Sequence, residues 1–155
     1  MFARLTQFAV IALVLGIAGQ AKAAPLTYGT YYDESVFVSC NSAFFCRVSF
    51  SQTPANKLLM VKKISCSSSS STQLSQGFLQ IGTIFGGNPV PRYVPLALPA
   101  PAFINGAYYT NFREDTHFLI GRGRFPYVEV QNGLGTPTNY SINCTLIGDL
   151  MAPSE

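Results

Sequence analysis

The chain has 155 residues, ten of them basic and seven acidic, which gives a net charge of +3 at neutral pH. A chain of this length forms one domain with a sizeable hydrophobic core. Two of the basic residues, Arg4 and Lys22, lie in the N-terminal segment, so the remaining chain carries a net charge of only +1. It has no lysine or arginine stripe suited to nucleic acid. We therefore expect a single domain that does not bind nucleic acid.

The N-terminal segment has the three parts of a secretory signal peptide. Arg4 supplies a positive charge, Phe8–Gly19 is an apolar run, and Ala21–Ala23 is a small-residue cleavage motif. The run is roughly a dozen residues, shorter than the ~20 that a membrane-spanning helix needs; an uncleaved anchor is the alternative. We expect cleavage after Ala23, which leaves residues 24–155 outside the cytoplasm, periplasmic or secreted, with no stable membrane span.

The first segment of this domain, Pro25–Glu34, is polar and aromatic and predicts an edge strand or an extended arm. It carries Tyr28, Tyr31 and Tyr32. Tyrosine rings can line sugar or peptide sites because they supply contact area at low entropic cost. We therefore name all three as candidate binding residues. The alternative is that the rings pack over the edge of the sheet.

The segment Val36–Phe50 has the clearest strand pattern in the chain. Apolar side chains occupy every second position on either side of a five-residue loop, which predicts a hairpin with one buried face. Cys40 and Cys46 fall on that face and oppose each other, at the separation that a disulfide needs. Phe44 and Phe45 lie in the loop and, if exposed, form a contact surface for a partner; folding back over the domain is the alternative.

The middle of the chain predicts two further strands. The first, Leu58–Cys66, keeps its apolar residues on one face only if a bulge lies near Lys62 and Lys63. The serine-rich segment Ser67–Thr72 that follows predicts a flexible polar loop. The second strand is expected over Phe78–Phe85.

Proline and glycine mark the boundaries of the next segments. Val90–Ala102 contains four prolines, which restricts it to an edge strand or an extended crossing. Ile104–Ala107 contains Asn-Gly, the preferred sequence of a two-residue hairpin turn. We expect a strand over Tyr108–Phe112, a charged turn over Arg113–Thr116, and another strand over His117–Ile120.

The C-terminal part completes the pattern. Tyr127–Gln131 predicts a strand, and Asn139–Gly148 predicts another in which alternate residues from Tyr140 to Leu146 point inward. No segment after the signal peptide has a helical period. Short strands separated by turns predict an all-β fold, an antiparallel β-sandwich of jelly-roll type with about eight strands.

All four cysteines lie after the predicted cleavage site. An even number of cysteines in an exported chain predicts two disulfides. Cys66 and Cys144 both fall on inward-facing positions, so strand parity pairs them with each other and leaves Cys40 for Cys46. A zinc site is the alternative, but the cysteine spacings fit no zinc ribbon or finger and the chain has one histidine. We expect no metal and no cofactor.

Titratable side chains gather in the predicted turn that begins at Arg113. His117 beside Asp115 has the composition of a general base with an orienting carboxylate. Glu114, Asp115 and Glu129 are the candidates for a catalytic carboxylate pair. A solvated turn is the simpler interpretation, because the serine run lacks the sequence context of a nucleophile and every cysteine is expected to be oxidised. We therefore expect no catalytic residues.

The segment Gly121–Pro126 interleaves Arg122 and Arg124 with two glycines. Two guanidinium groups and exposed backbone amides have the chemistry of an anion-binding loop. An ordinary turn is the alternative, since no strand-to-helix context accompanies the glycines. We include both arginines among the candidate binding residues.

Three segments carry a resemblance to known proteins. They are Cys46–Phe50, the strand Leu59–Cys66 that ends in Ile-Ser-Cys, and Cys144–Gly148. Together they resemble small uncharacterised exported β-rich proteins of alphaproteobacteria. The resemblance implies a bacterial origin and a periplasmic or secreted location, and it implies no activity and no functional residues.

These observations predict an exported, disulfide-stabilised, non-catalytic binding or surface-interaction module. A carbohydrate or another envelope component is the expected class of ligand, although the chain has no tryptophan to stack on a sugar. The alternatives are a structural subunit that pairs through an exposed strand edge and, less favoured, a small hydrolase that uses His117. The candidate binding surface comprises Tyr28, Tyr31, Tyr32, Phe44, Phe45, Arg122 and Arg124.

Overall fold

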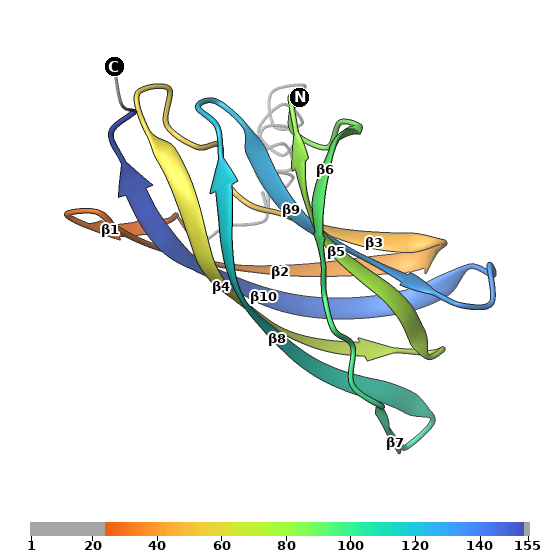
Figure 1. Ribbon diagram of the computed structural model, residues 1–155. Helices are drawn as coiled ribbons and strands as arrows, with labels where there is room; N and C mark the ends of the chain where they lie inside the picture. The colour runs from red at the N-terminus through yellow and green to blue at the C-terminus, as the bar shows by residue number, and fades with distance from the viewer. Residues whose placement is uncertain (1–23, 154–155) are drawn as a thin grey trace, which may run out of the picture.

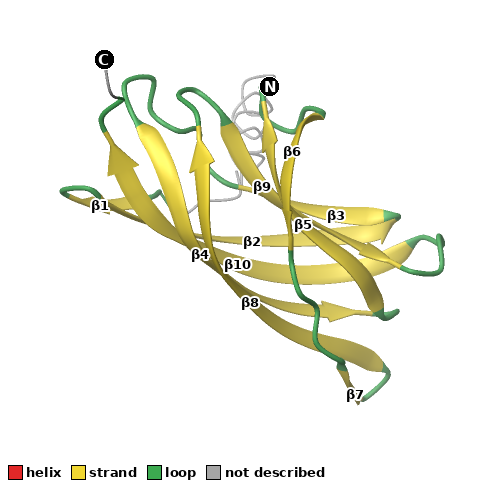
Figure 2. Cartoon of the chain, viewed as in Figure 1, coloured by secondary structure: helices red, strands yellow, loops and turns green. Residues whose placement is uncertain are grey.

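The structure is a computed structural model that describes residues 24–153. This range contains ten β-strands and no helix (Figure 1; Figure 2). The predicted signal peptide, residues 1–23, lies outside the described residues. In chain order the strands are β1 (Leu26–Tyr28), β2 (Tyr31–Ala43), β3 (Phe45–Ser49), β4 (Leu58–Ser70), β5 (Leu74–Gly82), β6 (Pro89–Pro95), β7 (Ala102–Ile104), β8 (Ala107–Ile120), β9 (Phe125–Asn132) and β10 (Thr138–Met151).

The strands form two antiparallel sheets that share one hydrophobic core. The larger sheet has six strands in the order β1-β2-β10-β4-β8-β7, and the smaller sheet has four in the order β3-β9-β5-β6. Figure 1 shows the long strands β2, β10, β4 and β8 running side by side. The inward-facing apolar side chains of both sheets form the core, which confirms the all-β sandwich. The strand count exceeds the expected eight partly because β1 and β7 are short edge strands of three residues each.

The alternation of apolar residues predicted two of the central strands well. In β10 the side chains of Tyr140, Ile142 and Leu146 are buried, as expected for its inward face. In the pairing of β4 with β10, Val61 lies opposite Gly148 and Lys63 lies opposite Ile147, so Lys62 is an extra residue of β4. Lys62 is therefore the predicted bulge, and it allows apolar residues on both sides of it to face the core.

Both predicted disulfides are present, and the described residues contain no free cysteine. Cys66 and Cys144 are directly opposite each other in β4 and β10, with their Cα atoms 4.1 Å apart. The Cα atoms of Cys40 and Cys46 are 5.7 Å apart. The predicted connectivity, which combined inward parity with the closeness of Cys40 and Cys46 in the sequence, is therefore confirmed.

The prediction of a hairpin over Val36–Phe50 is wrong. Its first strand belongs to the larger sheet, as β2, and its second belongs to the smaller sheet, as β3. The chain turns the corner at Ser42, which has a φ of 49° and donates its backbone N–H to Asn139 Oδ1 at 2.8 Å. The disulfide Cys40–Cys46 consequently joins two sheets instead of closing a hairpin.

The prediction of a serine loop over Ser67–Thr72 is also wrong. Strand β4 continues to Ser70, and the side chains of Ser68 and Ser70 are buried. Ser68 Oγ donates to the Thr110 carbonyl at 3.2 Å and Ser70 Oγ donates to the Thr72 carbonyl at 2.7 Å. Short hydroxyl side chains are accommodated on the inner face because they find backbone acceptors there.

The charged turn predicted at Arg113–Thr116 does not exist. These residues lie in the middle of β8, a strand of fourteen residues. The Asn-Gly turn before β8 is confirmed: Asn105 and Gly106 have φ values of 50° and 81° and connect β7 to β8. Charged residues are tolerated within β8 because Arg113 and Asp115 point away from the core and are exposed.

In the smaller sheet, the bounds of β5 differ from the prediction and the position of β6 agrees with it. Strand β5 begins at Leu74 and ends at Gly82, whereas a strand was expected over Phe78–Phe85. The apolar residues Ile84 and Phe85 are exposed in the following loop. The proline-rich strand β6 lies at the edge of the sheet, as its prolines require.

Candidate binding surface and cleft

The outer face of the larger sheet is covered by short, uncharged polar side chains. They occupy most outward positions in the middle of β2, β10 and β4 and one such position on β8, and we call this surface the polar face. Its members alternate along each strand with residues of the core. The polar face comprises Ser35, Ser39 and Asn41 of β2, Asn139, Ser141, Asn143 and Thr145 of β10, Ser65, Ser67 and Ser69 of β4, and Asn111 of β8.

The strand register arranges the polar face in rows across the sheet. In one row Asn143 lies between Phe37 and Ser67, and Ser67 is followed by Asn111. The adjacent row is built in the same way from Ser39, Ser141, Ser69 and Tyr109. Side chains therefore repeat about every 4.8 Å across the strands and about every 6.7 Å along them.

Much of the hydrogen-bonding capacity of the polar face is unused within the protein. Ser35 and Thr145 share a hydrogen bond of 2.7 Å between their hydroxyls, and Ser39 Oγ donates weakly to the Tyr140 carbonyl. The side chains of Ser65, Ser67, Ser69, Ser141, Asn111 and Asn143 make no hydrogen bond with any other described residue. Their hydroxyl and amide groups are available to solvent or to a ligand.

Two aromatic side chains flank the polar face. Phe37 on β2 is 65% exposed and Tyr109 on β8 is 44% exposed. Both contribute to the same shallow depression, of about 210 Å³, whose floor is formed by Ser67, Ser69 and their neighbours. Two further depressions, of about 300 and 230 Å³, lie over the same strands. The surface is thus a hollowed platform with an aromatic ring at each side, and Arg113 is the one charged residue that lines its depressions.

Charged residues border the polar face at one end. Arg113 lines the largest of the three depressions and lies 3.4 Å from Asp115 on the same strand. Both are exposed, so this ion pair adds little to stability. His117 is exposed on the same outward parity, whereas Glu114 has the opposite parity. The cluster named from the sequence therefore lies along the outer strand β8 and not in a turn.

A larger cleft of about 690 Å³ lies beyond the end of the polar face that is opposite these charges. Its walls come from the β4–β5 connection, from the segment Leu98–Ala100, from Tyr108 at the start of β8, and from Gly133 and Leu134 in the β9–β10 connection. Leucine, proline and tyrosine side chains alternate there with serine, threonine and glutamine. No charged residue lines the cleft.

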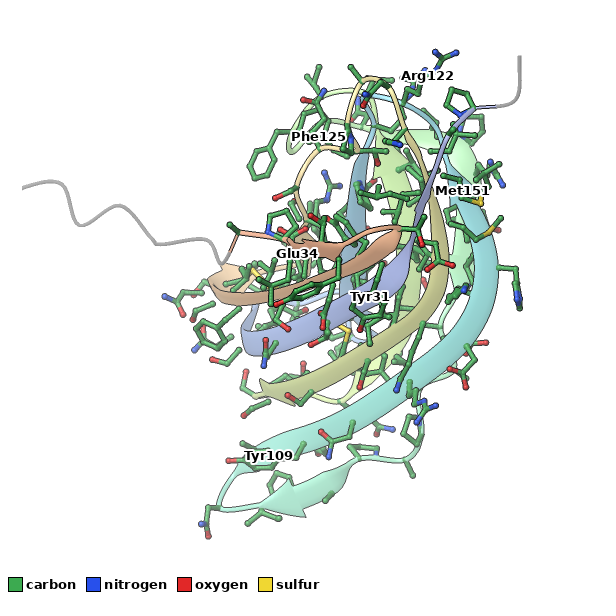
Figure 3. The ribbon with its side chains drawn as sticks, turned by 90° about the vertical axis from the view of Figure 1, so that its left-hand side faces the viewer. Tyr31, Glu34, Tyr109, Arg122, Phe125 and Met151 are labelled. Atoms are coloured by element: carbon green, nitrogen blue, oxygen red, sulfur yellow. A yellow bond between two sulfur atoms is a disulfide. The ribbon has the colours of Figure 1, made fainter. Side chains whose placement is uncertain are left out.

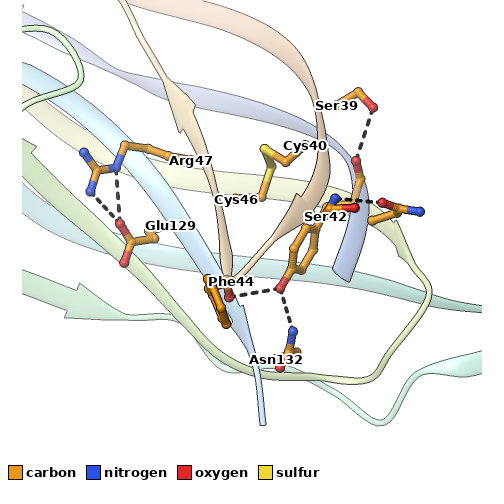
Figure 4. Close-up of a disulfide and its surroundings, with 10 residues drawn as sticks. Ser39, Cys40, Ser42, Phe44, Cys46, Arg47, Glu129 and Asn132 are labelled. Carbon is orange, nitrogen blue, oxygen red and sulfur yellow. Dashed lines mark hydrogen bonds and ion pairs between the residues drawn. A yellow bond between two sulfur atoms is a disulfide. The ribbon is translucent and has the colours of Figure 1, made fainter. Parts of the chain in front are cut away.

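A buried polar network holds the loops beside the cleft. Asn132 Nδ2 donates to the Thr138 hydroxyl at 2.7 Å and to the Tyr140 hydroxyl at 3.0 Å, and the Thr138 and Thr72 hydroxyls lie 2.9 Å apart. The Tyr140 hydroxyl donates to the Phe44 carbonyl at 3.2 Å (Figure 4). The β2–β3, β4–β5 and β9–β10 connections are held together by these hydrogen bonds at one end of the sandwich.

The three tyrosines predicted as binding residues do not form one surface. Tyr28 and Tyr31 are exposed at the junction of β1 and β2. Tyr32 is only 2% exposed and cannot belong to a binding surface. Its hydroxyl donates to Glu34 Oε2 at 2.5 Å, and burial, followed by the hydrogen bond and charge of Glu34, raises the pKa of Tyr32 above its ordinary value.

The other predicted binding residues lie in two further places. Phe44 and Phe45 are exposed at the corner between β2 and β3, which meets the condition for a contact surface. Arg122 and Arg124 are exposed in the β8–β9 connection. Figure 3 shows Arg122 at the end of the sandwich remote from Tyr109. The seven candidates are therefore distributed over three separate regions.

The carboxylates proposed as a catalytic pair are also separated. Glu129 belongs to β9 of the smaller sheet, where it lies 2.7 Å from Arg47 Nη2 (Figure 4). It also accepts a hydrogen bond from Gln131. Glu114 and Asp115 belong to β8 of the larger sheet. Among the described residues no group of three histidine, cysteine, aspartate or glutamate side chains could hold a metal ion.

The buried acid Glu34 was not predicted from the sequence. Glu34 is 2% exposed and accepts hydrogen bonds from the Ser51 backbone N–H, from Ser51 Oγ at 2.8 Å and from Tyr32. Its sequence position carried a signal, because Glu34 has the same parity as the inward-facing Val36. The polar face was not predicted either. Its central strand, β4, was expected to end before the serine run, which was predicted to be a loop.

Comparisons of the chain with protein-family models, with curated proteins and with solved structures found no match. The resemblance to exported alphaproteobacterial proteins therefore stays a prediction. Over residues 24–153, no helix is long and apolar enough to cross a membrane. The two disulfides are typical of a protein that folds outside the cytoplasm.

Proposed function

We propose that this protein is an exported, non-catalytic binding domain whose polar face holds an uncharged carbohydrate chain. The observation that carries the proposal is the lattice of short hydroxyl and amide side chains on β2, β10, β4 and β8, most of which make no side-chain hydrogen bond within residues 24–153. Function resides in such a site and not in the sandwich fold, which serves many roles.

The chemistry of the polar face matches that of a sugar polymer. Serine, threonine and asparagine side chains both donate and accept hydrogen bonds, as sugar hydroxyls do. The lattice presents these groups over several strands, which suits an extended chain better than a small molecule. Phe37 and Tyr109 offer exposed rings at the two sides, against which the apolar face of a sugar can pack. An uncharged lattice gives no attraction for a polyanion.

The non-catalytic part of the proposal is supported by the position of the titratable residues. His117 and Asp115 are exposed on the outer strand β8, where water surrounds them. Serine and threonine side chains near them belong to a flat sheet surface and not to an enclosed site. We expect His117→Ala to leave both the fold and the binding unchanged. A hydrolase activity that disappears in this variant, at an unchanged melting temperature, would contradict the non-catalytic assignment.

The proposal is tested by measuring retention of the purified domain on a panel of immobilised neutral polysaccharides. Ser67→Arg places a large charged side chain at the centre of the polar face and should weaken binding at least about tenfold, which corresponds to about 1.4 kcal/mol. Gln76→Arg is the matched control, because Gln76 is also exposed on a strand but lies in the smaller sheet. Absence of any retained polysaccharide, or equal effects of the two variants, would overturn the proposal.

A further inference from the structure

The cleft at the end of the sandwich adjoins the polar face at one residue. Ser71 lines both the cleft and the adjacent depression of about 230 Å³. The next contacts lie on opposite faces of β8: Ala107 has outward parity and lines the depression, whereas Tyr108 has inward parity and lines the cleft. A chain that lies along the polar face therefore reaches the cleft only by bending around the end of the sheet at Ser71.

The lining of the cleft suits one sugar ring better than the open sheet does. Its volume of about 690 Å³ falls within the usual range of small-molecule sites. Leu74, Leu98 and the ring of Tyr108 supply apolar surface, while Thr72 and Gln73 supply groups that bind hydroxyls. A sugar ring has the same combination, with an apolar face surrounded by hydroxyl groups.

The position and rigidity of the cleft favour the end of a chain. The cleft lies where β4 ends and β8 begins, so the sheet surface does not extend beyond it. Its floor includes the buried side chain of Leu74, and the hydrogen bond between Thr72 and Thr138 ties one wall to β10. Leu134, which is 70% exposed, stands at the rim.

We infer that the cleft binds the terminal sugar of the carbohydrate whose preceding units lie on the polar face. The inference rests on the proposed function and adds a specificity to it: the domain recognises chain ends and not the interior of a polymer. The polar face contributes weaker, repeated contacts, whereas the cleft offers apolar and hydroxyl-binding groups together to the last unit.

The experiment uses the neutral polysaccharide that is retained in the panel, cut into oligomers of increasing length. End recognition predicts one protein molecule bound per accessible chain end at every length, and an affinity per chain that stops rising once the polar face is filled. Interior recognition predicts a number of bound molecules that grows with length. Calorimetric titration measures both quantities.

A matched pair of variants completes the test. Leu134→Asp places a charge at the rim of the cleft and should weaken binding of the oligomers at least tenfold. Leu26→Asp is the control, because Leu26 is 59% exposed on β1, away from the cleft. Circular dichroism and melting temperature establish that both variants fold.

The possible outcomes separate the two proposals. Stoichiometry that grows with length, together with a harmless Leu134→Asp, overturns end recognition and leaves the proposed function standing. If Leu134→Asp loses binding while Ser67→Arg binds like the wild type, the cleft binds the sugar without the polar face. This result overturns both the proposed role of the polar face and the proposal that preceding units lie on it. If the wild-type protein retains no polysaccharide, both proposals fail.

Discussion

Glu34 is a buried acid whose hydrogen-bond acceptors are fully occupied by neighbouring donors. Both of its oxygens accept from the Ser51 backbone N–H, at 3.0 and 2.9 Å, and the Ser51 and Tyr32 hydroxyls complete the set. A carboxylate that is removed from water is stable only when such donors surround it. These contacts join the start of β2 to the segment that follows β3, so the pair Glu34 and Ser51 connects the two sheets.

Tyr32 should make stability fall in alkaline solution. Burial and the hydrogen bond to Glu34 raise its pKa above the ordinary value of 10.0. The folded protein therefore keeps the phenol proton at a pH at which the unfolded chain releases it. Its contribution to stability is complete below pH 10 and is lost as the pH rises further, by up to about 1.4 kcal/mol per pH unit.

Chemical denaturation of the wild type and of Tyr32→Phe, from neutral pH to above pH 10, measures this effect. The variant is expected to be less stable at neutral pH, because it lacks the hydrogen bond, but to show a shallower loss in alkali. The comparison concerns the two slopes, since the other tyrosines titrate in both proteins. Parallel curves above pH 10 would show that Tyr32 ionises normally in the fold.

Among the strands, β8 has an open edge, and this edge gives its charged residues a structural role. Strand β7 pairs with β8 only at Ala107–Tyr109, and no described strand pairs with the outer side of β8 from Thr110 to Ile120. An open edge of this length is a template for pairing with another chain. Arg113, Asp115 and Glu114, the last with inward parity, are the kind of residues that prevent such pairing.

Removing these charges should therefore promote self-association. We expect Glu114→Val combined with Asp115→Thr to give concentration-dependent oligomers in sedimentation velocity, while the wild-type protein remains a monomer. Asp33→Thr is the control, because Asp33 also loses a charge but is paired on both sides, with Leu26 and Ile147. Polymers of the wild-type protein would instead favour a structural subunit that assembles through β8.

The two disulfides should differ in their effect on stability. Cys66 and Cys144 are separated by 78 residues and Cys40 and Cys46 by six. The chain-entropy model assigns about 4–5 kcal/mol to the long loop and roughly 2 kcal/mol to the short one. Double alanine variants of each pair avoid free thiols, and calorimetry should give the lower melting temperature for the variant that lacks Cys66 and Cys144. The reverse order would mean that the corner between the sheets matters more than loop length.

At the scale of the whole molecule, the uncharged character of the polar face and the cleft sets the salt dependence of binding. Exposed charges are screened strongly when the Debye length falls to about 3 Å at 1 M salt. Binding through hydroxyl and amide groups should therefore change by less than about twofold between dilute buffer and about 1 M sodium chloride. Retention on the immobilised polysaccharide measures this directly. A steep loss of binding at high salt would instead indicate that the ligand binds through Arg113, Arg122 or Arg124.

Several features of the fold follow from local periodicity and could be predicted without the structure. Alternation of apolar residues identified β10 and the bulge in β4, and inward parity together with the closeness of Cys40 and Cys46 gave the correct disulfides. Asn105 and Gly106 predicted their turn because few other residues adopt positive φ. The proline content of β6 predicted an edge. Each of these properties is encoded within a few neighbouring residues.

Tertiary structure decided which strands are neighbours and which polar residues share a surface. Alternation shows that β2 and β3 each have a buried face, but it does not show that they belong to different sheets. The polar face exists only because β2, β10, β4 and β8 lie side by side, although β2 and β10 are separated by most of the chain. The serine run and the charged segment of β8 have the composition of loops. They are strands because neighbouring strands, and not their own propensity, satisfy their backbone groups.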